Sequence, residues 1–121
     1  MKIRQGFVSN SSSTSFYIDA SKYSCEKIEE AIKRMLELLS FCQDSDAENI
    51  NSVCTIGTAS KDSIVQKMEI FYDYDGRKKE KFGSFLPNKI IAVDSVDDNS
   101  IPYCIQEFLC TAFNAERQHW G

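Results

Sequence analysis

The chain has 121 residues, of which 42% are hydrophobic and 26% are charged, and its formal net charge is −4. This length favours a single domain over residues 1–121. The negative charge gives no electrostatic footprint for binding a nucleic-acid backbone, and no run of roughly 18 apolar residues predicts a membrane span. The five cysteines are odd in number and include no CxxC pair, which favours reduced, mostly buried thiols and a cytoplasmic location over a disulfide framework.

A serine-rich segment lies near the start of the chain. We expect a Ser-rich loop at residues 9–15, between two short strands with the sequences IRQGFV and SFYID. Three interpretations stay open for this loop: a solvated connection, a recognition or modification segment, and a phosphate site built from hydroxyls and backbone N–H groups. The glycines and the lysine of a Walker loop are missing, so the solvated connection is favoured.

The clearest predicted element is a helix over residues 24–43. Its apolar residues recur at intervals of three and four, which places them on one helical face; they are Cys25, Ile28, Ile32, Met35, Leu39 and Cys42. Ser24 suits the N-cap position. Because the pattern lasts for fewer than three heptads, a helix that faces the core is favoured over a coiled coil.

The next part of the chain contains a strand and an ambiguous segment. Residues 43–51 are polar and predict a loop, and SVCTIGTA predicts a strand. Residues 61–75 fit two patterns: a helix capped by Ser60 with Ile64, Val65, Met68 and Phe71 on one face, or a strand in which Met68, Ile70, Tyr72 and Tyr74 alternate with polar residues. The dipeptide Asp75-Gly76 is typical of a type I′ turn, so we expect a helical turn near 60–66 and a hairpin at about 67–85.

The last part of the chain predicts a strand and a second helix. NKIIAVDS, residues 88–95, has the composition of a buried strand, and an amphipathic helix follows at about 100–114. Asn99 or Ser100 would cap this helix, with Pro102 in its first turn. The expected fold is therefore α+β: one mixed or antiparallel sheet that includes the hairpin and is covered by two helices. A doubly wound fold would require residues 61–75 to be helical throughout.

Two groups of residues are candidates for sites. The serine loop and the acidic segment Asp94–Asn99 could converge on a phosphate-bearing small molecule, with the ligand-binding residues Ser9, Asn10, Ser11, Ser12, Ser13, Asp97, Asp98 and Asn99. The alternative for the acidic segment is a loop that caps the following helix. A second set, which combines the hairpin with the C-terminus, could contact a partner; it comprises Tyr72, Tyr74, Arg77, Lys79, His119 and Trp120.

The second set has plain alternatives as well. Basic and aromatic residues on a hairpin can bind single-stranded nucleic acid weakly, but the lysines of residues 67–85 equally suit the protection of a sheet edge. His119 is the only histidine, and the cysteine spacings fit no common zinc pattern. The C-terminal HWG is expected to pack onto the fold or onto a partner, with Trp120 as an anchor.

The opening MKIRQGFVSNSSSTSF resembles an N-terminal pattern, roughly GFVSNSSSSSF, found in many uncharacterised proteins of prokaryotes and their viruses. The match covers about 16 residues, and Thr14 stands where the pattern has serine. The stretches DNSIPY and ERQHWG are also similar to the ends of small proteins in that group. The resemblance implies an origin in a virus or mobile element and no particular reaction.

The sequence favours an accessory protein that acts by binding a partner protein as an inhibitor or modulator. We expect no cofactor and no metal, and no membrane or nucleic-acid partner, while a homodimer stays open. An enzymatic role is not favoured, because no constellation of nucleophile, acid and base is recognisable. The two alternatives are the small-molecule site described above, with binding or hydrolysis of a nucleotide or phosphate, and weak single-stranded nucleic-acid binding by the hairpin.

Overall fold

A single antiparallel sheet forms the centre of the protein. The computed structural model describes residues 13–72, 86–97 and 100–120. Four strands lie in the order β2-β3-β1-β4, and every neighbouring pair is antiparallel; the strands are β1 (Ser13–Asp19), β2 (Cys54–Ser60), β3 (Lys89–Ser95) and β4 (Glu116–Trp120). The predicted α+β class is confirmed.

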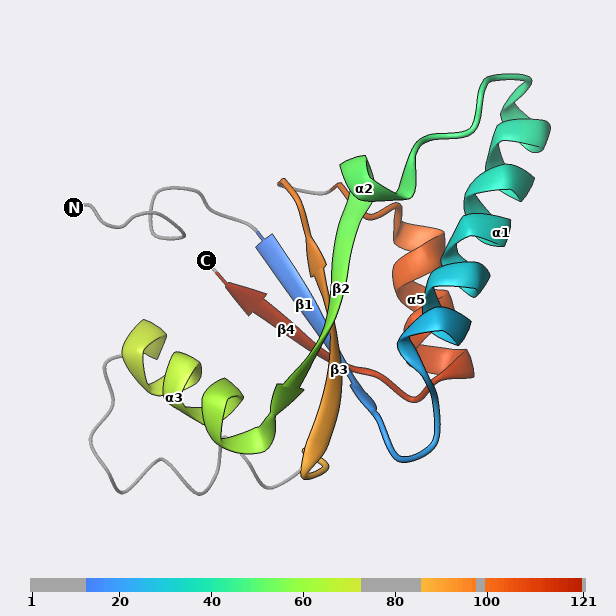
Figure 1. Ribbon diagram of the computed structural model, residues 1–121. Coiled ribbons are helices and arrows are strands. Elements are labelled where there is room, and N and C mark those ends of the chain that lie inside the picture. Colours follow the sequence, from blue (N-terminus) through green and yellow to red (C-terminus); the bar gives the residue numbers. More distant parts are fainter. Residues whose placement is uncertain (1–12, 73–85, 98–99, 121) are drawn as a thin grey trace.

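Helices cover both faces of the sheet. Figure 1 shows α1 and α5 side by side on one face and α3 on the other. The described helices are α1 (Cys25–Gln43), α2 (Ile50–Val53), α3 (Lys61–Tyr72) and α5 (Tyr103–Ala112). The two covering helices predicted from the sequence correspond to α1 and α5. Helix α3 adds a layer on the second face, whereas only a helical turn near residues 60–66 was predicted in this part of the chain.

The larger core lies between the sheet and the pair α1 and α5. Ser24 caps α1 as predicted, because its side chain accepts a hydrogen bond from Lys27 N–H at 3.2 Å. The three-and-four spacing of α1 buries one stripe of the helix against β1 and β3, where alternate residues point to this face. This core includes Phe16, Ile18, Ile28, Ile32, Leu36, Ile91, Val93, Ile105, Leu109 and Phe113.

The segment after β2 corrects the sequence analysis. A hairpin strand was expected from residue 67, but residues 67–72 are the second half of α3, and residues 73–85 lie outside the described part. The helical pattern prevails because Ile64 and Met68 can bury themselves on the second face of the sheet, against Tyr17 and Trp120. Ser60 accepts a hydrogen bond from Ser63 N–H at 3.2 Å at the start of this helix.

Two further differences concern the C-terminal part. The helix predicted from residue 100 begins at Tyr103, with Pro102 at the N-cap and no side-chain cap. The Ser100 hydroxyl instead donates to Val53 O at 2.6 Å. The terminal sequence ERQHW was not predicted as a strand, yet it forms β4 along the outer side of β1.

No helix within the described ranges is long and apolar enough to cross a membrane.

The opposite exposures of Met68 and Ile70 provide a test of α3. Met68 is 6% exposed and Ile70 is 70% exposed, whereas a strand would place these two residues on the same face. Met68→Ala should therefore lower the free energy of unfolding by about 2 kcal/mol or more, and Ile70→Ala should change it by less than about 0.5 kcal/mol. Urea unfolding of the two variants measures both values, and equal losses would support a strand instead.

Candidate functional site

The serine run and the acidic segment meet where β1 begins and β3 ends. Thr14 N–H donates to Ser95 Oγ at 3.0 Å, and the Ser15 hydroxyl donates to Asp94 Oδ1. Both contacts follow from the antiparallel register, which pairs Ser15 with Asp94. The end of the serine run is therefore attached to the strand that leads into the acidic segment. Of the Ser-rich loop predicted at residues 9–15, residues 13–15 are the start of β1 and not a loop, and residues 9–12 lie outside the described residues.

A third strand joins this contact through Trp120. The indole Nε1–H of Trp120 donates to Ser15 Oγ at 2.8 Å, so one hydroxyl accepts from β4 and donates to β3. Ser15 is 1% exposed and Trp120 is 2% exposed. The ammonium of Lys67 lies 4.6 Å from the centroid of the indole ring, on the α3 side. The C-terminal HWG was expected to pack either onto the fold or onto a partner. Trp120 packs into the fold and is not exposed to a partner.

A hollow opens beside this network, between α3 and the sheet. Its volume is about 330 Å³. It is lined by Tyr17 of β1, residues 55–59 of β2, Ala92 and Asp94 of β3, and Ile64 and Lys67 of α3. The register places Thr55, Asp94 and Ser15 in one cross-strand row, and Gly57, Ala92 and Tyr17 in the next. The carboxylate of Asp94 and the ammonium group of Lys67 thus belong to residues that border a hollow, which is also lined by the small residues Gly57 and Ala92.

Of the predicted ligand-binding residues, only two fall in the described part. Ser13 pairs with Trp120 at the start of β1, and Asp97 is exposed, with its backbone N–H bonded to Ser100 Oγ at 3.2 Å. Asp97 is not among the residues that line the hollow. The other predicted positions lie outside the described residues: Ser9, Asn10, Ser11, Ser12, Asp98 and Asn99.

The predicted interaction residues are not brought together as a described surface. Tyr72 ends α3, and Tyr74, Arg77 and Lys79 lie outside the described residues. His119 is exposed on β4, where its Nδ1 lies 3.1 Å from Thr14 Oγ1 in a hydrogen bond. Because residues 67–72 are helical, the nucleic-acid hypothesis loses the first strand of the hairpin on which it depended.

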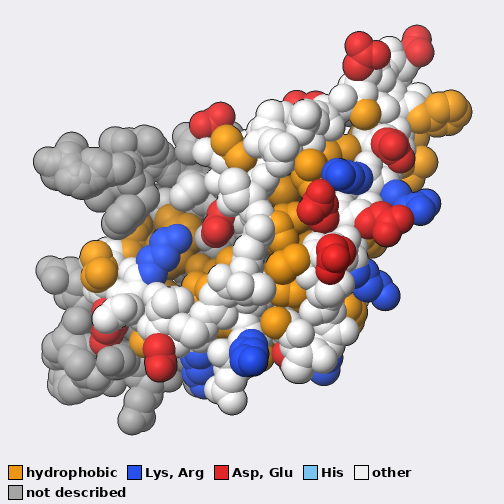
Figure 2. All heavy atoms as spheres, in the orientation of Figure 1, with side chains coloured by type: hydrophobic (Ala, Val, Ile, Leu, Met, Phe, Trp, Pro, Cys, Tyr) orange, Lys and Arg blue, Asp and Glu red, His pale blue; other side chains and the backbone are white. Residues whose placement is uncertain are grey.

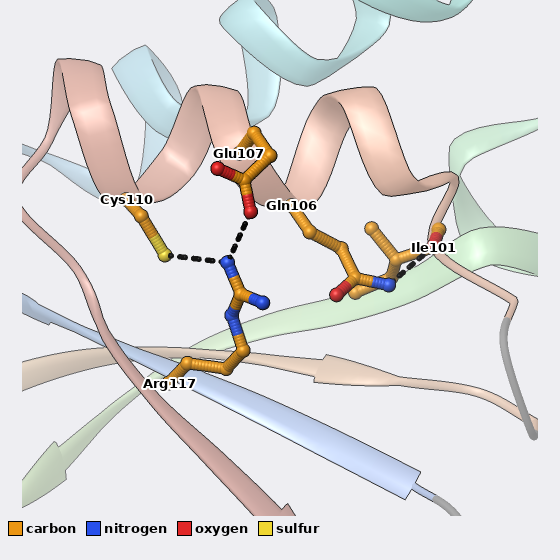
Figure 3. Close-up of polar contacts among 5 residues, drawn as sticks. All are labelled: Ile101, Gln106, Glu107, Cys110 and Arg117. Atoms are coloured by element: carbon orange, nitrogen blue, oxygen red, sulfur yellow. Dashed lines mark hydrogen bonds and ion pairs between the residues drawn. The ribbon is translucent and has the colours of Figure 1, made fainter.

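Arg117 forms a polar cluster on the opposite face of the sheet (Figure 3). Its Nη2 donates to Glu107 Oε2 at 2.7 Å and to Cys110 Sγ at 3.4 Å. The hydrogen bond from Arg117 holds the pKa of the Glu107 carboxyl below its ordinary value, and the bonds to Cys110 and Glu107 raise the pKa of Arg117. The guanidinium also lies over the ring of Phe16. This cluster fastens β4 to α5.

The cysteines and acids offer little chemistry in the described ranges. All five cysteines are free thiols, but only Cys54 is buried, so the expectation of mostly buried thiols was wrong. Burial, and then the charges of Asp94 and Glu29, raise the pKa of the Cys54 thiol to about 11, which keeps it unreactive near neutral pH. The residues that the structure describes include no group of three or more His, Cys, Asp or Glu side chains that could hold a metal ion.

Sequence reasoning missed Lys67, Gly57 and the special position of Ser15. Lys67 faces the sheet only if residues 61–72 are helical, which the hairpin hypothesis denied. Gly57 lies in a predicted strand, and nothing in its neighbours indicates that its side of the sheet is open. Ser15 is one of several serines in sequence, and only the partners Asp94 and Trp120 distinguish it.

Comparison of the chain with protein-family models, curated proteins and solved structures gave no match.

The buried hydroxyl of Ser15 predicts a measurable loss of stability. Ser15→Ala would leave the Trp120 indole N–H without its acceptor and Asp94 without its donor, which should cost about 1–3 kcal/mol. Ser13→Ala, at the partly exposed start of the same strand, should change the free energy of unfolding by less than about 0.5 kcal/mol. Chemical denaturation of both variants tests this difference, and equal stabilities would show that the network contributes nothing.

Proposed function

We propose that this chain acts by binding a partner protein, and that the partner adds an extended segment to the outer edge of β2. The observation that carries the proposal is the uncharged character of this seven-residue edge strand. An added strand gains main-chain hydrogen bonds without needing a deep pocket. The absence of a recognisable catalytic constellation in the sequence favoured a binding function of this kind.

The ladder between β2 and β3 decides which backbone groups point outward. Val96 N–H donates to Val53 O at 3.2 Å, so residue 53 belongs to a hydrogen-bonded pair with β3. Hydrogen-bonded and non-bonded pairs alternate along an antiparallel ladder. Odd-numbered positions of β2 therefore bond to β3, and the even-numbered Ile56 and Thr58 direct their N–H and C=O groups away from the sheet. No described residue outside the sheet bonds to these groups.

The two edges of the sheet differ in how they are protected. Edge strands of natural proteins commonly carry charges or proline, which discourage pairing with another chain. On the other edge, β4 has five residues that include Glu116, Arg117 and His119. The strand β2 has the sequence CTIGTAS, with neither a charge nor a proline, and Thr55, Gly57 and Thr58 are exposed. The edge at β2 is therefore the better template for an incoming strand.

The surface beside β2 supports an extended and largely uncharged partner segment. In Figure 2, hydrophobic side chains lie between β2 and α1, and charged side chains of both signs gather over α1 itself. An uncharged segment along β2 would cover the apolar band and leave the charges of α1 in water. We place this function in the cytoplasm, which the five free thiols support, and in an accessory role in a virus or mobile element, which the opening motif supports.

A selection with random peptides tests the proposal. Peptides selected on the purified protein from a displayed library should slow the hydrogen exchange of the Ile56 and Thr58 amides, since both acquire bonds to the added strand. Thr58→Lys should weaken peptide binding by about tenfold or more, because a charge at an edge opposes strand pairing. Thr111→Lys makes the same change on the exposed side of α5 and should leave binding unchanged.

Three results would count against this function. The selection could yield no peptide, the selected peptides could protect amides elsewhere, or they could bind Thr58→Lys as tightly as the native chain. Sedimentation of the protein alone gives a further check. A dimer that Thr58→Lys dissociates and Thr111→Lys does not would assign the edge to a second copy of this chain instead of a partner protein.

A further inference from the structure

The hollow under α3 exists because the sheet carries very small residues there. Gly57, Ala59 and Ala92 lie beneath it, and a Cβ atom built on Gly57 would meet no heavy atom within 4 Å. The hollow is open to solvent along β2, where Thr55, Gly57 and Thr58 are exposed, and its volume is about 330 Å³. The volume lies at the lower end of the range for small-molecule sites, roughly 300–1,000 Å³.

One carboxylate and one ammonium group border the hollow. Asp94 is half-buried, and the Ser15 hydroxyl fixes its Oδ1, whereas Oδ2 accepts no hydrogen bond from a described residue. Lys67 reaches the same space from α3 and forms no ion pair with any described carboxylate. The contact of its ammonium with the Trp120 ring keeps this charge close to the network that holds Asp94.

We propose that the hollow binds a small zwitterion of amino-acid size. The ligand's ammonium group donates to Asp94, its carboxylate accepts from Lys67, and the body of the molecule lies over Gly57 and Ala92. Charge-assisted hydrogen bonds of this kind are stronger than neutral ones. The exposed hydroxyl of Thr55, in the same cross-strand row as Asp94, offers one further hydrogen bond.

The pair of opposite charges also selects against other ligands. A phosphate would be repelled by Asp94, which lies in the same hollow as Lys67, and a dication would be repelled by Lys67. The hollow therefore favours a ligand different from the phosphate-bearing molecule that the serine run suggested. This site uses side chains on the α3 face, whereas the proposed partner edge uses outward backbone groups of Ile56 and Thr58, so either can fail without the other.

A titration with free amino acids tests the site. Each of the common amino acids is added to ¹⁵N-labelled protein, and the amide signals of Gly57 and Ala92 are followed by NMR. At least one free amino acid should shift both signals with a Kd of ~10 mM or tighter. Its N-acetyl derivative and its carboxamide each lack one charge, and each should bind about tenfold more weakly or worse.

Three variants locate the binding. Gly57→Val fills the hollow with a side chain that the strand tolerates, and it should abolish the shift of Ala92. Lys67→Met keeps an aliphatic chain beside Trp120 but removes the charge. The free amino acid should therefore bind the Lys67→Met variant no more tightly than the carboxamide of the amino acid binds the native chain. Lys27→Met removes an exposed charge from α1 and should have no effect. If Gly57→Val does not fold, the proposal is decided by comparing the affinity of the amino acid for Lys67→Met with its affinity for Lys27→Met.

The proposal is overturned if no amino acid shifts Gly57 and Ala92 at ~10 mM, a concentration that detects even weak binding. It is also overturned if the uncharged derivatives bind as well as the parent amino acid, or if Lys67→Met binds like the native chain.

Discussion

The hydroxyl of Ser15 is the interaction on which the arrangement of the sheet's upper end depends. It lies near the start of β1, an inner strand of the sheet, accepts from the Trp120 indole and donates to Asp94, and so joins three strands through one buried atom. A buried donor or acceptor left without a partner costs about 1–3 kcal/mol, and here the hydroxyl provides a partner for both Trp120 and Asp94. Because Trp120 is held there, its ring lies 4.6 Å from the ammonium of Lys67. Asp94, which the same hydroxyl holds, is one of the residues that line the hollow.

The two faces of the sheet carry cores of different size. The face under α1 and α5 is filled by large aliphatic side chains, whereas the face under α3 has a smaller core that includes Tyr17, Met68 and Trp120. Beside this smaller core, Gly57, Ala59 and Ala92 line the hollow. The strand β2 belongs to both proposals. Its small side chains border the hollow in which we propose a small zwitterion binds, and its outward backbone groups form the edge to which we propose a partner strand is added. The proposed protein-binding function and the proposed ligand site thus both depend on one short, uncharged edge strand.

The sequence predicts the elements whose signal is local and misses those that depend on distant contacts. The spacing of apolar residues and the cap at Ser24 identify α1, because both act within a few residues of the chain. Residues 61–72 carry a helical and a strand pattern together, and the second face of the sheet decides between them by offering Tyr17 and Trp120 as packing partners. The sequence of β4 is mostly polar, and only its pairing with β1 makes it a strand. For the same reason Ser15 could not be singled out among its neighbours.

The most direct measurement is the hydrogen exchange of the Trp120 indole N–H in the native protein, followed by NMR. If Ser15 accepts this proton inside a closed network, the proton should exchange only when the whole domain unfolds, with an opening free energy equal to the global free energy of unfolding. In Ser15→Ala, the opening free energy for exchange of this proton should then lie well below the global free energy of unfolding. An indole proton that exchanges as quickly in the native chain as in a solvent-exposed tryptophan would contradict the account.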